Sequence, residues 1–208
     1  MGDGEATGAP ARRALTPGAR RVLDAAAELF YGQGINAVGV DLIAQRAGVT
    51  KKTLYDRFGS KDALVAAYLR ERDERWRGWL TARVEEAGRS AGEAAGTARV
   101  VATFDALEVW TRRENPRGCA FVNAAAELPD PTHPGHLAVI EQKRWLRDYL
   151  RALCRATPAA DPERLADELV LLYEGAMVLG GLAVVDEPVR LARELAVRAL
   201  AQRGLTAT

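Results

Sequence analysis

One short stretch of the chain gathers side chains that can donate hydrogen bonds to phosphates and to the edges of DNA bases. Lys51, Lys52, Thr53, Tyr55 and Arg57 lie close together, and their ammonium, guanidinium and hydroxyl groups are the donors that such acceptors require. A solvated helix face is the alternative explanation for these residues. Their place on the second helix of the motif described next favours contact with DNA.

The residues just before that stretch predict how it is positioned. Ile43, Ala44 and Ala47 form an apolar stripe on one helix, and Gly48 ends that helix because a residue without Cβ can adopt φ > 0. Thr50 is a favourable N-cap for a second helix. Two short helices joined by a glycine turn form a helix-turn-helix, which presents its second helix to the major groove.

The segment from Arg21 to Leu69 resembles the DNA-binding domain of the TetR family of bacterial transcriptional regulators. The matching elements are AAAELFYGQGINAVGVDLIAQRAGVT and KKTLYDRFGSKDALVAAYL, which include the Ala-Gly-Val turn, the Thr-Leu-Tyr core and the Phe-x-Ser-Lys-Asp-x-Leu segment. Many spaced positions agree at once, so the signal is strong. The resemblance implies a homodimer that binds a double-stranded DNA operator and responds to a small-molecule effector.

The resemblance also assigns residues to DNA contacts. Tyr55 and Lys61 match positions that the family uses for phosphates, and Arg57 stands where relatives often have His. Gly39 stands where relatives often cap the first helix of the motif with Ser or Thr, so only backbone amides remain there to meet a phosphate. The predicted DNA-binding residues are Gly39, Thr50, Lys51, Lys52, Thr53, Tyr55, Arg57 and Lys61.

Charge is distributed unevenly along the chain. The net charge of +1 excludes a globally basic nucleic-acid binder, yet residues 12–61 hold nine Lys/Arg against four Asp/Glu, a local excess of +5 that leaves −4 for the rest. Three of the four lysines fall in this segment. Electrostatic attraction to phosphate is therefore expected at one end of the protein.

We expect a cytoplasmic protein from the bulk features of the sequence. A chain of 208 residues holds one or two small domains, and no apolar run approaches the roughly 20 residues of a membrane helix. No signal-peptide pattern opens the sequence. Cys119 and Cys154 lie in apolar surroundings, which favours buried thiols over a disulfide framework.

Helical periodicity, capping residues and the lack of alternating runs predict an all-α fold of about nine helices. We expect a disordered arm at 1–15, a three-helix helix-turn-helix domain at 16–62 and a helical ligand-binding and dimerisation domain at 63–208. The fourth helix is expected to run from Lys61 to about Glu86. The loop after it would be punctuated by Gly88, Gly92 and Gly96.

The middle of that fourth helix, RERDER, is rich in charge. We expect it to be a solvated strut between the two domains, with Glu71–Arg75 and Asp73–Arg77 pairs four residues apart. As the element that joins the domains, it is the expected lever between ligand and DNA.

Bulky aromatic side chains in the second domain predict either plain core packing or, taken together with the resemblance, a ligand pocket. Asn123 is a polar group on a short apolar helix, where it would bind a ligand or cap a neighbouring helix end. The predicted ligand-binding residues are Trp79, Phe104, Trp110, Phe121, Asn123, Tyr173 and Met177.

Glycines near the C-terminus predict close packing. Gly175, Gly180 and Gly181 weaken a helix unless a close approach compensates, either from an adjacent subunit or from a ligand. The resemblance implies dimerisation through the last two long helices. Small residues on the last of them fit that role: Ala192, Ala196 and Ala199.

The sequence offers little support for an enzymatic function. His133 and His136 have metal-ligand spacing, but Pro131 and Pro134 interrupt any helical face, and the sequence contains no nucleophile elbow, P-loop or dinucleotide fingerprint. No cofactor or metal is predicted. The alternatives to a ligand-responsive regulator are a DNA-binding protein without effector and an all-α enzyme with an incidental helix-turn-helix.

Overall fold

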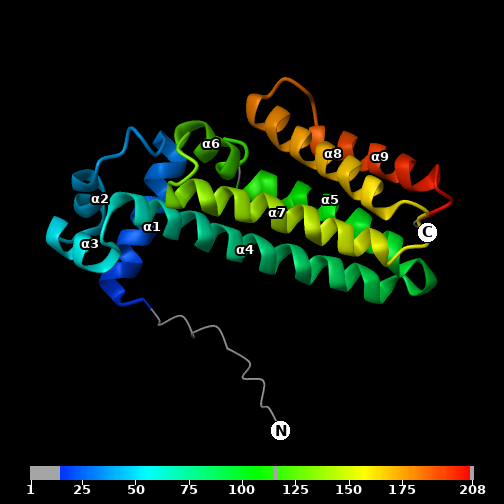
Figure 1. Ribbon diagram of the computed structural model, residues 1–208, viewed down its shortest axis with the longest axis horizontal. Helices are drawn as coiled ribbons and strands as arrows, with labels where there is room; N and C mark the ends of the chain where they lie inside the picture. Colours follow the sequence, from blue (N-terminus) through cyan, green and yellow to red (C-terminus); the bar gives the residue numbers. More distant parts are fainter. Residues whose placement is uncertain (1–14, 115–116, 207–208) are drawn as a thin grey trace, which may run out of the picture.

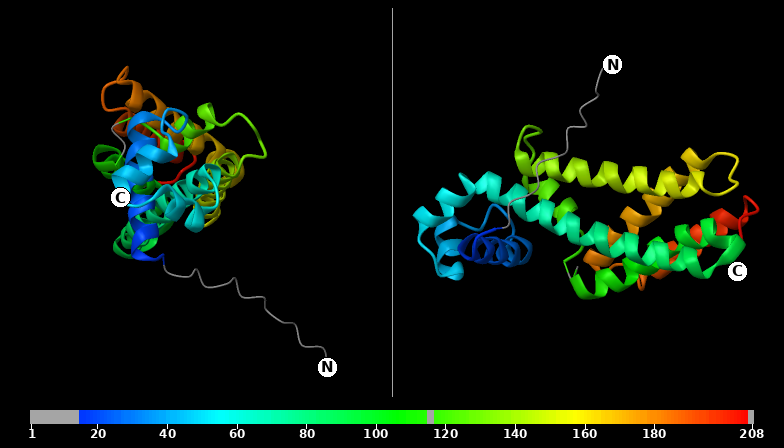
Figure 2. Two further views of the ribbon diagram at one scale, coloured as in Figure 1. Left: turned by 90° about the vertical axis from the view of Figure 1, so that its left-hand side faces the viewer. Right: turned by 90° about the horizontal axis from the view of Figure 1, so that it is seen from below.

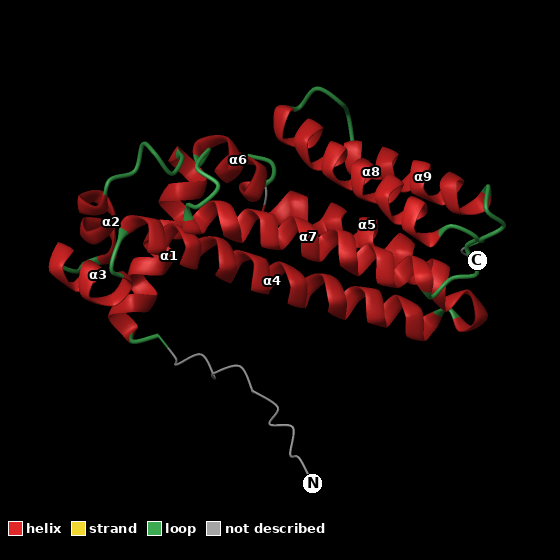
Figure 3. Cartoon of the chain, in the orientation of Figure 1, coloured by secondary structure: helices red, strands yellow, loops and turns green. Residues whose placement is uncertain are grey.

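The computed structural model describes residues 15–114 and 117–206, and within them it contains helices and loops but no strand (Figures 1 and 3). The all-α prediction is confirmed. Nearly all of the predicted arm at 1–15, with Arg12 and Arg13, falls outside the described residues. Nine α-helices and one short 3₁₀ turn make up the described part: α1 Pro17–Gln33, α2 Val40–Ala47, α3 Lys51–Phe58, α4 Lys61–Ser90, η1 Gly92–Ala94, α5 Ala95–Glu114, α6 Ala120–Glu127, α7 Pro134–Arg155, α8 Pro162–Leu182 and α9 Pro188–Ala201.

Helices α1 to α3 form a compact head at one end of the molecule (Figure 1). Thr16 caps α1 and Pro17 opens it, as expected where an N–H would go unused. Gly48 ends α2 with the left-handed φ of 62° that the helix-turn-helix requires. Ile43 and Leu54 are fully buried and pack the two helices into one core. The head is thus held by apolar contacts, which leaves its polar groups for the surface.

Helix α4 is longer than the sequence predicted. It extends over 30 residues to Ser90, so the predicted end at Glu86 is wrong, and Gly88 lies inside it rather than in a loop. A Cβ at Gly88 would overlap the Arg99 side chain, and one at Gly96 would lie 2.9 Å from the Ala156 carbonyl oxygen. These glycines allow close helix packing and do not break the helices in which they lie.

The charged middle of α4 is only in part the solvated strut that was expected, because Asp73 is buried while Glu74 and Arg75 are exposed. Asp73 is only 8% exposed, and the predicted pair with Arg77 is present. Glu71 binds Arg20 of α1 at 2.7 Å, in place of the predicted partner Arg75. Helices α5 and α7 run alongside α4 (Figure 2).

The larger part of the molecule is a bundle in which α8 and α9 pack against α5 and α7 (Figures 1 and 2). Short α6 lies between this bundle and the head. The centre of the bundle consists of fully buried side chains: Phe104, Leu107, Leu146, Leu150, Leu165 and Leu169.

Candidate DNA-binding surface and ligand cavity

Helix α3 presents the predicted DNA contacts on its outer face. Lys51, Lys52, Tyr55 and Arg57 are exposed, while Leu54 on the opposite face is fully buried. The side chain of Lys52 is 82% exposed. The apolar face fixes the orientation of the helix, so the basic face is directed outward.

Thr50 is the N-cap of α3. Its hydroxyl oxygen accepts a hydrogen bond from the Thr53 backbone N–H at 3.1 Å, and the two hydroxyl oxygens lie 2.9 Å apart. Gly39 is the N-cap of α2 and supplies no side-chain hydrogen bond, so the first amides of α2 have no side-chain cap. Lys61, half-buried, opens α4 beside its cap Ser60.

Both lysines of α3 pair with carboxylates of the head. Lys51 Nζ lies 3.0 Å from Asp41, and Lys52 Nζ lies 2.7 Å from Asp56. The hydrogen bond to Asp41 raises the pKa of Lys51. Exposed pairs of this kind contribute little to stability. These two pairs place carboxylates beside the predicted phosphate contacts, which was not predicted from the sequence.

A junction of four residues joins the head to the bundle: Tyr31, Arg117, Gly118 and Gly181. The Tyr31 hydroxyl accepts from the Arg117 backbone N–H at 2.9 Å and donates to the Gly118 carbonyl oxygen at 3.0 Å. The Arg117 guanidinium donates to the Tyr31 carbonyl oxygen at 2.7 Å. These contacts fasten the end of α1 to the segment before α6.

The same segment touches α8 through glycine. A Cβ at Gly181 would lie 2.6 Å from the Gly118 Cα, so no side chain fits there. The close approach at Gly181 therefore comes from this chain itself, not from a partner subunit or a ligand. Gly175 has nothing within 4 Å of the corresponding position.

Asn123 belongs to this region between head and bundle. Its side-chain amide donates to the Arg117 carbonyl oxygen at 3.0 Å. On the same helix, Glu127 accepts from the Asn36 backbone N–H at 2.7 Å. Asn123 thus serves the junction, apart from the aromatic side chains with which it was grouped.

A small cavity of about 30 Å³ lies among α4, α5, α6, α7 and α8. Four of the predicted ligand-binding residues line it, namely Trp110, Phe121, Tyr173 and Met177. Phe104 is fully buried behind Tyr173, with ring centroids 5.6 Å apart. Trp79 does not line the cavity, and the Arg83 guanidinium carbon lies 3.4 Å from the centroid of its ring.

The aromatic wall of this cavity continues in Trp76, whereas its polar residues were not predicted from the sequence. Trp76 packs against Trp110, with ring centroids 5.1 Å apart. Lys143 Nζ donates to both carboxylate oxygens of Glu174 at 2.7 Å and lies 3.5 Å from Cys119 Sγ. Burial works to lower the pKa of Lys143, but Cys119 and Glu174 raise it overall, so the ammonium stays charged.

Two polar groups of the cavity have no partner. Gln142 Oε1 and the Tyr173 hydroxyl are buried without a hydrogen bond from any residue that the structure describes. Burial raises the pKa of Tyr173 well above its usual value, so the hydroxyl remains protonated. Buried polar atoms normally find partners, which marks both groups as candidates for ligand contact.

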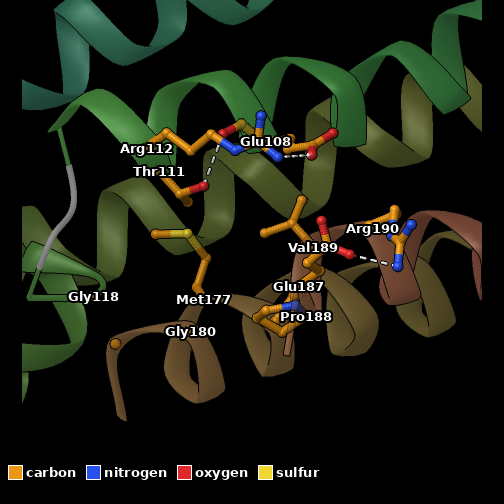
Figure 4. Close-up of a pocket in the computed structure, with 12 residues that line it drawn as sticks. Glu108, Thr111, Arg112, Gly118, Met177, Gly180, Glu187, Pro188, Val189 and Arg190 are labelled. Atoms are coloured by element: carbon orange, nitrogen blue, oxygen red, sulfur yellow. Dashed lines mark hydrogen bonds and ion pairs between the residues drawn. The ribbon is translucent and has the colours of Figure 1, made fainter. Parts of the chain in front are cut away.

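A second, open space of about 340 Å³ lies between α5, α8 and α9 (Figure 4). Met177 projects from α8 across it towards Thr111 and Arg112 of α5. Among the described residues, Met177 is the one that lines both this cleft and the small cavity. Its flexible side chain therefore borders both spaces.

The outer faces of α8 and α9 are unusually apolar. The α8–α9 apolar surface consists of exposed side chains on these helices and their connection: Leu171, Val178, Leu179, Leu182, Val184, Leu191 and Leu195. Ala192 and Ala196, which were expected to serve a dimer, are buried within the protomer instead. The apolar face of α9 points inward at these alanines, and its larger leucines remain outside.

The two histidines contact helix ends and loops, and His133 Nε2 also lies 3.3 Å from Asp62 at the start of α4. His133 caps α7 by accepting from the Gly135 N–H at 2.9 Å, and His136 Nδ1 lies 2.8 Å from the Leu128 carbonyl oxygen. Among residues 15–114 and 117–206, no group of three metal-ligating side chains is present.

Comparison with known proteins agrees with this architecture. Residues 22–68 match "Bacterial regulatory proteins, tetR family", and residues 96–196 match "Tetracyclin repressor-like, C-terminal domain". The crystal structure of SCO4454, a TetR-family transcriptional regulator from Streptomyces coelicolor, is 34% identical and superposes with a TM-score of 0.76. The match covers 91% of this chain and 96% of that one. The chain belongs to the TetR family of bacterial transcriptional regulators. The head is therefore its helix-turn-helix DNA-binding domain.

Two TetR-like relatives extend the comparison. The HTH-type transcriptional regulator YjdC of Escherichia coli is 26% identical over 88% of this chain and 95% of its own length. The HTH-type transcriptional activator FasR of Mycolicibacterium smegmatis is 49% identical, but over only 24% of this chain and 22% of its own. In the part of the chain that the structure describes, no helix is long and apolar enough to span a membrane.

Proposed function

We propose that this TetR-family protein is a ligand-responsive repressor that binds a palindromic operator as a homodimer. The observation that carries the proposal is the basic outer face of α3, held outward by the fully buried Leu54. In a helix-turn-helix dimer two such helices reach half-sites about 34–36 Å apart, or a multiple of that distance. The proposed domain division is 16–62 for DNA binding and 63–208 for ligand binding and dimerisation.

Each predicted DNA contact has a defined part in this proposal. Lys52 and Tyr55, both exposed, contact phosphates or bases from the outer face of α3, and Lys51, Thr53 and Arg57 flank them. Thr50 holds the start of α3, Gly39 exposes the first amides of α2, and Lys61 contributes charge at the start of α4. Phosphate binding would draw Lys51 and Lys52 away from Asp41 and Asp56.

Dimerisation is supported by the α8–α9 apolar surface. Seven exposed apolar side chains on neighbouring segments exceed what isolated surface residues explain, and a second copy of the chain would cover them. Because both copies would meet through α8 and α9, their heads would stay free to face DNA.

Ligand response is supported by the aromatic cavity and by the junction. The cavity touches α8, and α8 touches the head through Gly181, Gly118 and Tyr31. A ligand that binds one arrangement of the heads better than another shifts the population towards it, with a coupling of about 1–3 kcal/mol in typical cases. A dimer seated on promoter DNA acts most simply by excluding polymerase, so release of the dimer from DNA on ligand binding would relieve repression.

The test is operator binding by the full chain, using DNA upstream of its own gene and of the divergent neighbour. Tight, salt-sensitive binding is expected, and Lys52→Ala/Tyr55→Ala should remove it. Arg89→Ala is the matched control, because Arg89 is an exposed cation at the far end of α4. Binding no stronger than to random DNA would contradict the proposal, as would equal losses in both variants. A reporter gene behind the bound DNA distinguishes repression from activation.

A further inference from the structure

The cavity contains an unpaired donor and an unpaired acceptor close to its aromatic walls. Tyr173 is 2% exposed and Gln142 is 4% exposed, and both line the same space. A protonated hydroxyl can donate a hydrogen bond, while the amide oxygen of Gln142 can only accept one. Such groups are unfavourable in a buried site unless something supplies the complementary atoms.

The charged groups around the cavity already have partners. The ammonium of Lys143 is held by both carboxylate oxygens of Glu174 at 2.7 Å. Arg72 donates to the Glu114 carbonyl oxygen at 2.7 Å, and its guanidinium lies over the Tyr31 ring. A charged ligand would bring an uncompensated charge into a buried site, so a neutral one is favoured.

The walls favour a flat ligand. Trp76, Trp110, Phe121 and Tyr173 surround the cavity with aromatic surface, and Trp76 meets Trp110 edge-on at 5.1 Å. Aromatic side chains hold planar groups by stacked or edge-to-face contacts.

The cavity must enlarge to admit such a ligand. Its volume of about 30 Å³ would hold little more than a water molecule, whereas a buried site that takes benzene measures about 150 Å³. Met177 lines both this cavity and the cleft of about 340 Å³, and a methionine side chain changes rotamer easily. Movement of Met177 would join the two spaces and open a route inward.

We infer that this cavity binds a neutral, planar molecule of about one aromatic ring, with a donor for Gln142 Oε1 and an acceptor for the Tyr173 hydroxyl. The ligand passes Met177 as it enters from the cleft between α5, α8 and α9. This inference rests on the proposed function, since it names the class of molecule to which the regulator responds.

The experiment uses three compounds of nearly equal shape: benzamide, benzoate and benzamidine. Benzamide is neutral and carries both a donor and an acceptor, whereas the other two are an anion and a cation near neutral pH. Binding to the full-length protein without DNA is measured by calorimetry and by quenching of tryptophan fluorescence. Benzamide is expected to bind at least about 10-fold more tightly than either charged compound.

Two variants test the polar contacts. Tyr173→Phe removes the hydroxyl and Gln142→Leu removes the side-chain amide, both at nearly constant volume, and each should weaken benzamide binding by about 10-fold. Both variants should also unfold at a higher temperature without ligand, because they remove a buried group that lacks a partner. Tyr149→Phe is the control: the Tyr149 hydroxyl is also buried and without a described partner but lies outside the cavity.

Met177 is tested by kinetics. Met177→Ala should speed the association of benzamide and keep the preference for the neutral compound, because it joins cleft and cavity.

Several results would overturn the inference. Equal affinity for the three compounds would do so, as would affinities unchanged by Tyr173→Phe and Gln142→Leu. A crystal structure with benzamide added that shows only an ordered water between these residues would also do so.

Operator binding separates failure of this inference from failure of the proposed function. Selective benzamide binding without any change in operator affinity supports the ligand class and contradicts the proposed ligand response. If other small molecules release the protein from operator DNA and benzamide does not bind, the proposed ligand response is supported and the inferred ligand class is contradicted.

Discussion

The head and the bundle differ in where they keep their polar groups. On α3 the cations are exposed, and Lys51 and Lys52 lie beside carboxylates that water can reach easily. In the cavity, Gln142 and Tyr173 are buried and have no partner among the described residues. Exposed lysines that can replace a carboxylate partner with a phosphate suit a large, charged partner that binds at the surface. A cavity with unmet hydrogen bonds suits a smaller partner that must be enclosed.

Changes at the proposed dimer surface should have the largest effect, and they should affect the head and the bundle differently. Leu182→Glu/Leu191→Glu places charges on two exposed leucines and should produce a monomer. Operator affinity should fall by about 100-fold or more, because two linked heads bind far better than one. Ligand binding inside each protomer should survive. Sedimentation and operator titration measure both effects.

The control for that variant is Leu137→Glu, which charges an exposed leucine on α7. It should remain dimeric and bind operator normally. A double variant that stays dimeric with full operator affinity would contradict a dimer built on α8 and α9.

The sequence was informative where the relevant residues are neighbours along the chain. Gly48, Thr50 and Leu54 fix the helix-turn-helix within a few positions, so turn, cap and buried face were all predictable. The fold class followed from helical periodicity. The end of α4 did not, because the packing of Arg99 of α5 against Gly88 is a tertiary contact, and a glycine at that place is locally just as consistent with a helix end.

The cavity could be predicted only in part. Its walls come from five helices, and nothing local distinguishes Gln142 from other polar residues of α7. Bulk alone selected Trp79 together with Trp110, although only Trp110 lines the cavity. Likewise, the contact of Gly181 with Gly118 depends on tertiary packing and leaves no trace in either local sequence.

Gly181→Ala would test whether the junction really holds the two regions together. The added Cβ would lie 2.6 Å from the Gly118 Cα, so the segment before α6 must shift. We expect a loss of about 1–3 kcal/mol in the free energy of unfolding, as for other overpacked sites.

Gly175→Ala is its matched control on the same helix. Nothing lies within 4 Å of that added Cβ, so the change should stabilise α8 by about 0.5–1 kcal/mol. Denaturant unfolding measures both variants, and equal effects would show that the Gly118 contact is unimportant.

Tyr31→Phe weakens the same junction from the side of the head. The change removes the acceptor of the Arg117 N–H and the donor to the Gly118 carbonyl oxygen. The expected cost is about 0.5–1.5 kcal/mol of unfolding free energy. If the junction carries the ligand signal, an inducer should also alter operator affinity less in this variant than in the wild type.

The smallest expected effect concerns the carboxylates on the DNA-binding surface. Asp41→Asn/Asp56→Asn removes the partners of Lys51 and Lys52 and two negative charges beside the predicted phosphates. Affinity for DNA of any sequence should rise about three- to ten-fold at low salt, and its salt dependence should steepen. Since exposed pairs contribute little to stability, unfolding should change by less than about 0.5 kcal/mol.

Asp148→Asn provides the control for this last effect. Asp148 is an exposed, paired carboxylate on α7, so its removal changes the net charge without altering the α3 surface. If both changes strengthened DNA binding equally per charge, the overall charge of the protein would govern the effect. If only the head variant did so, Asp41 and Asp56 would be local competitors of phosphate. They would then keep non-specific binding weak, so that discrimination among sequences would rest on the contacts that α3 makes within its proper site.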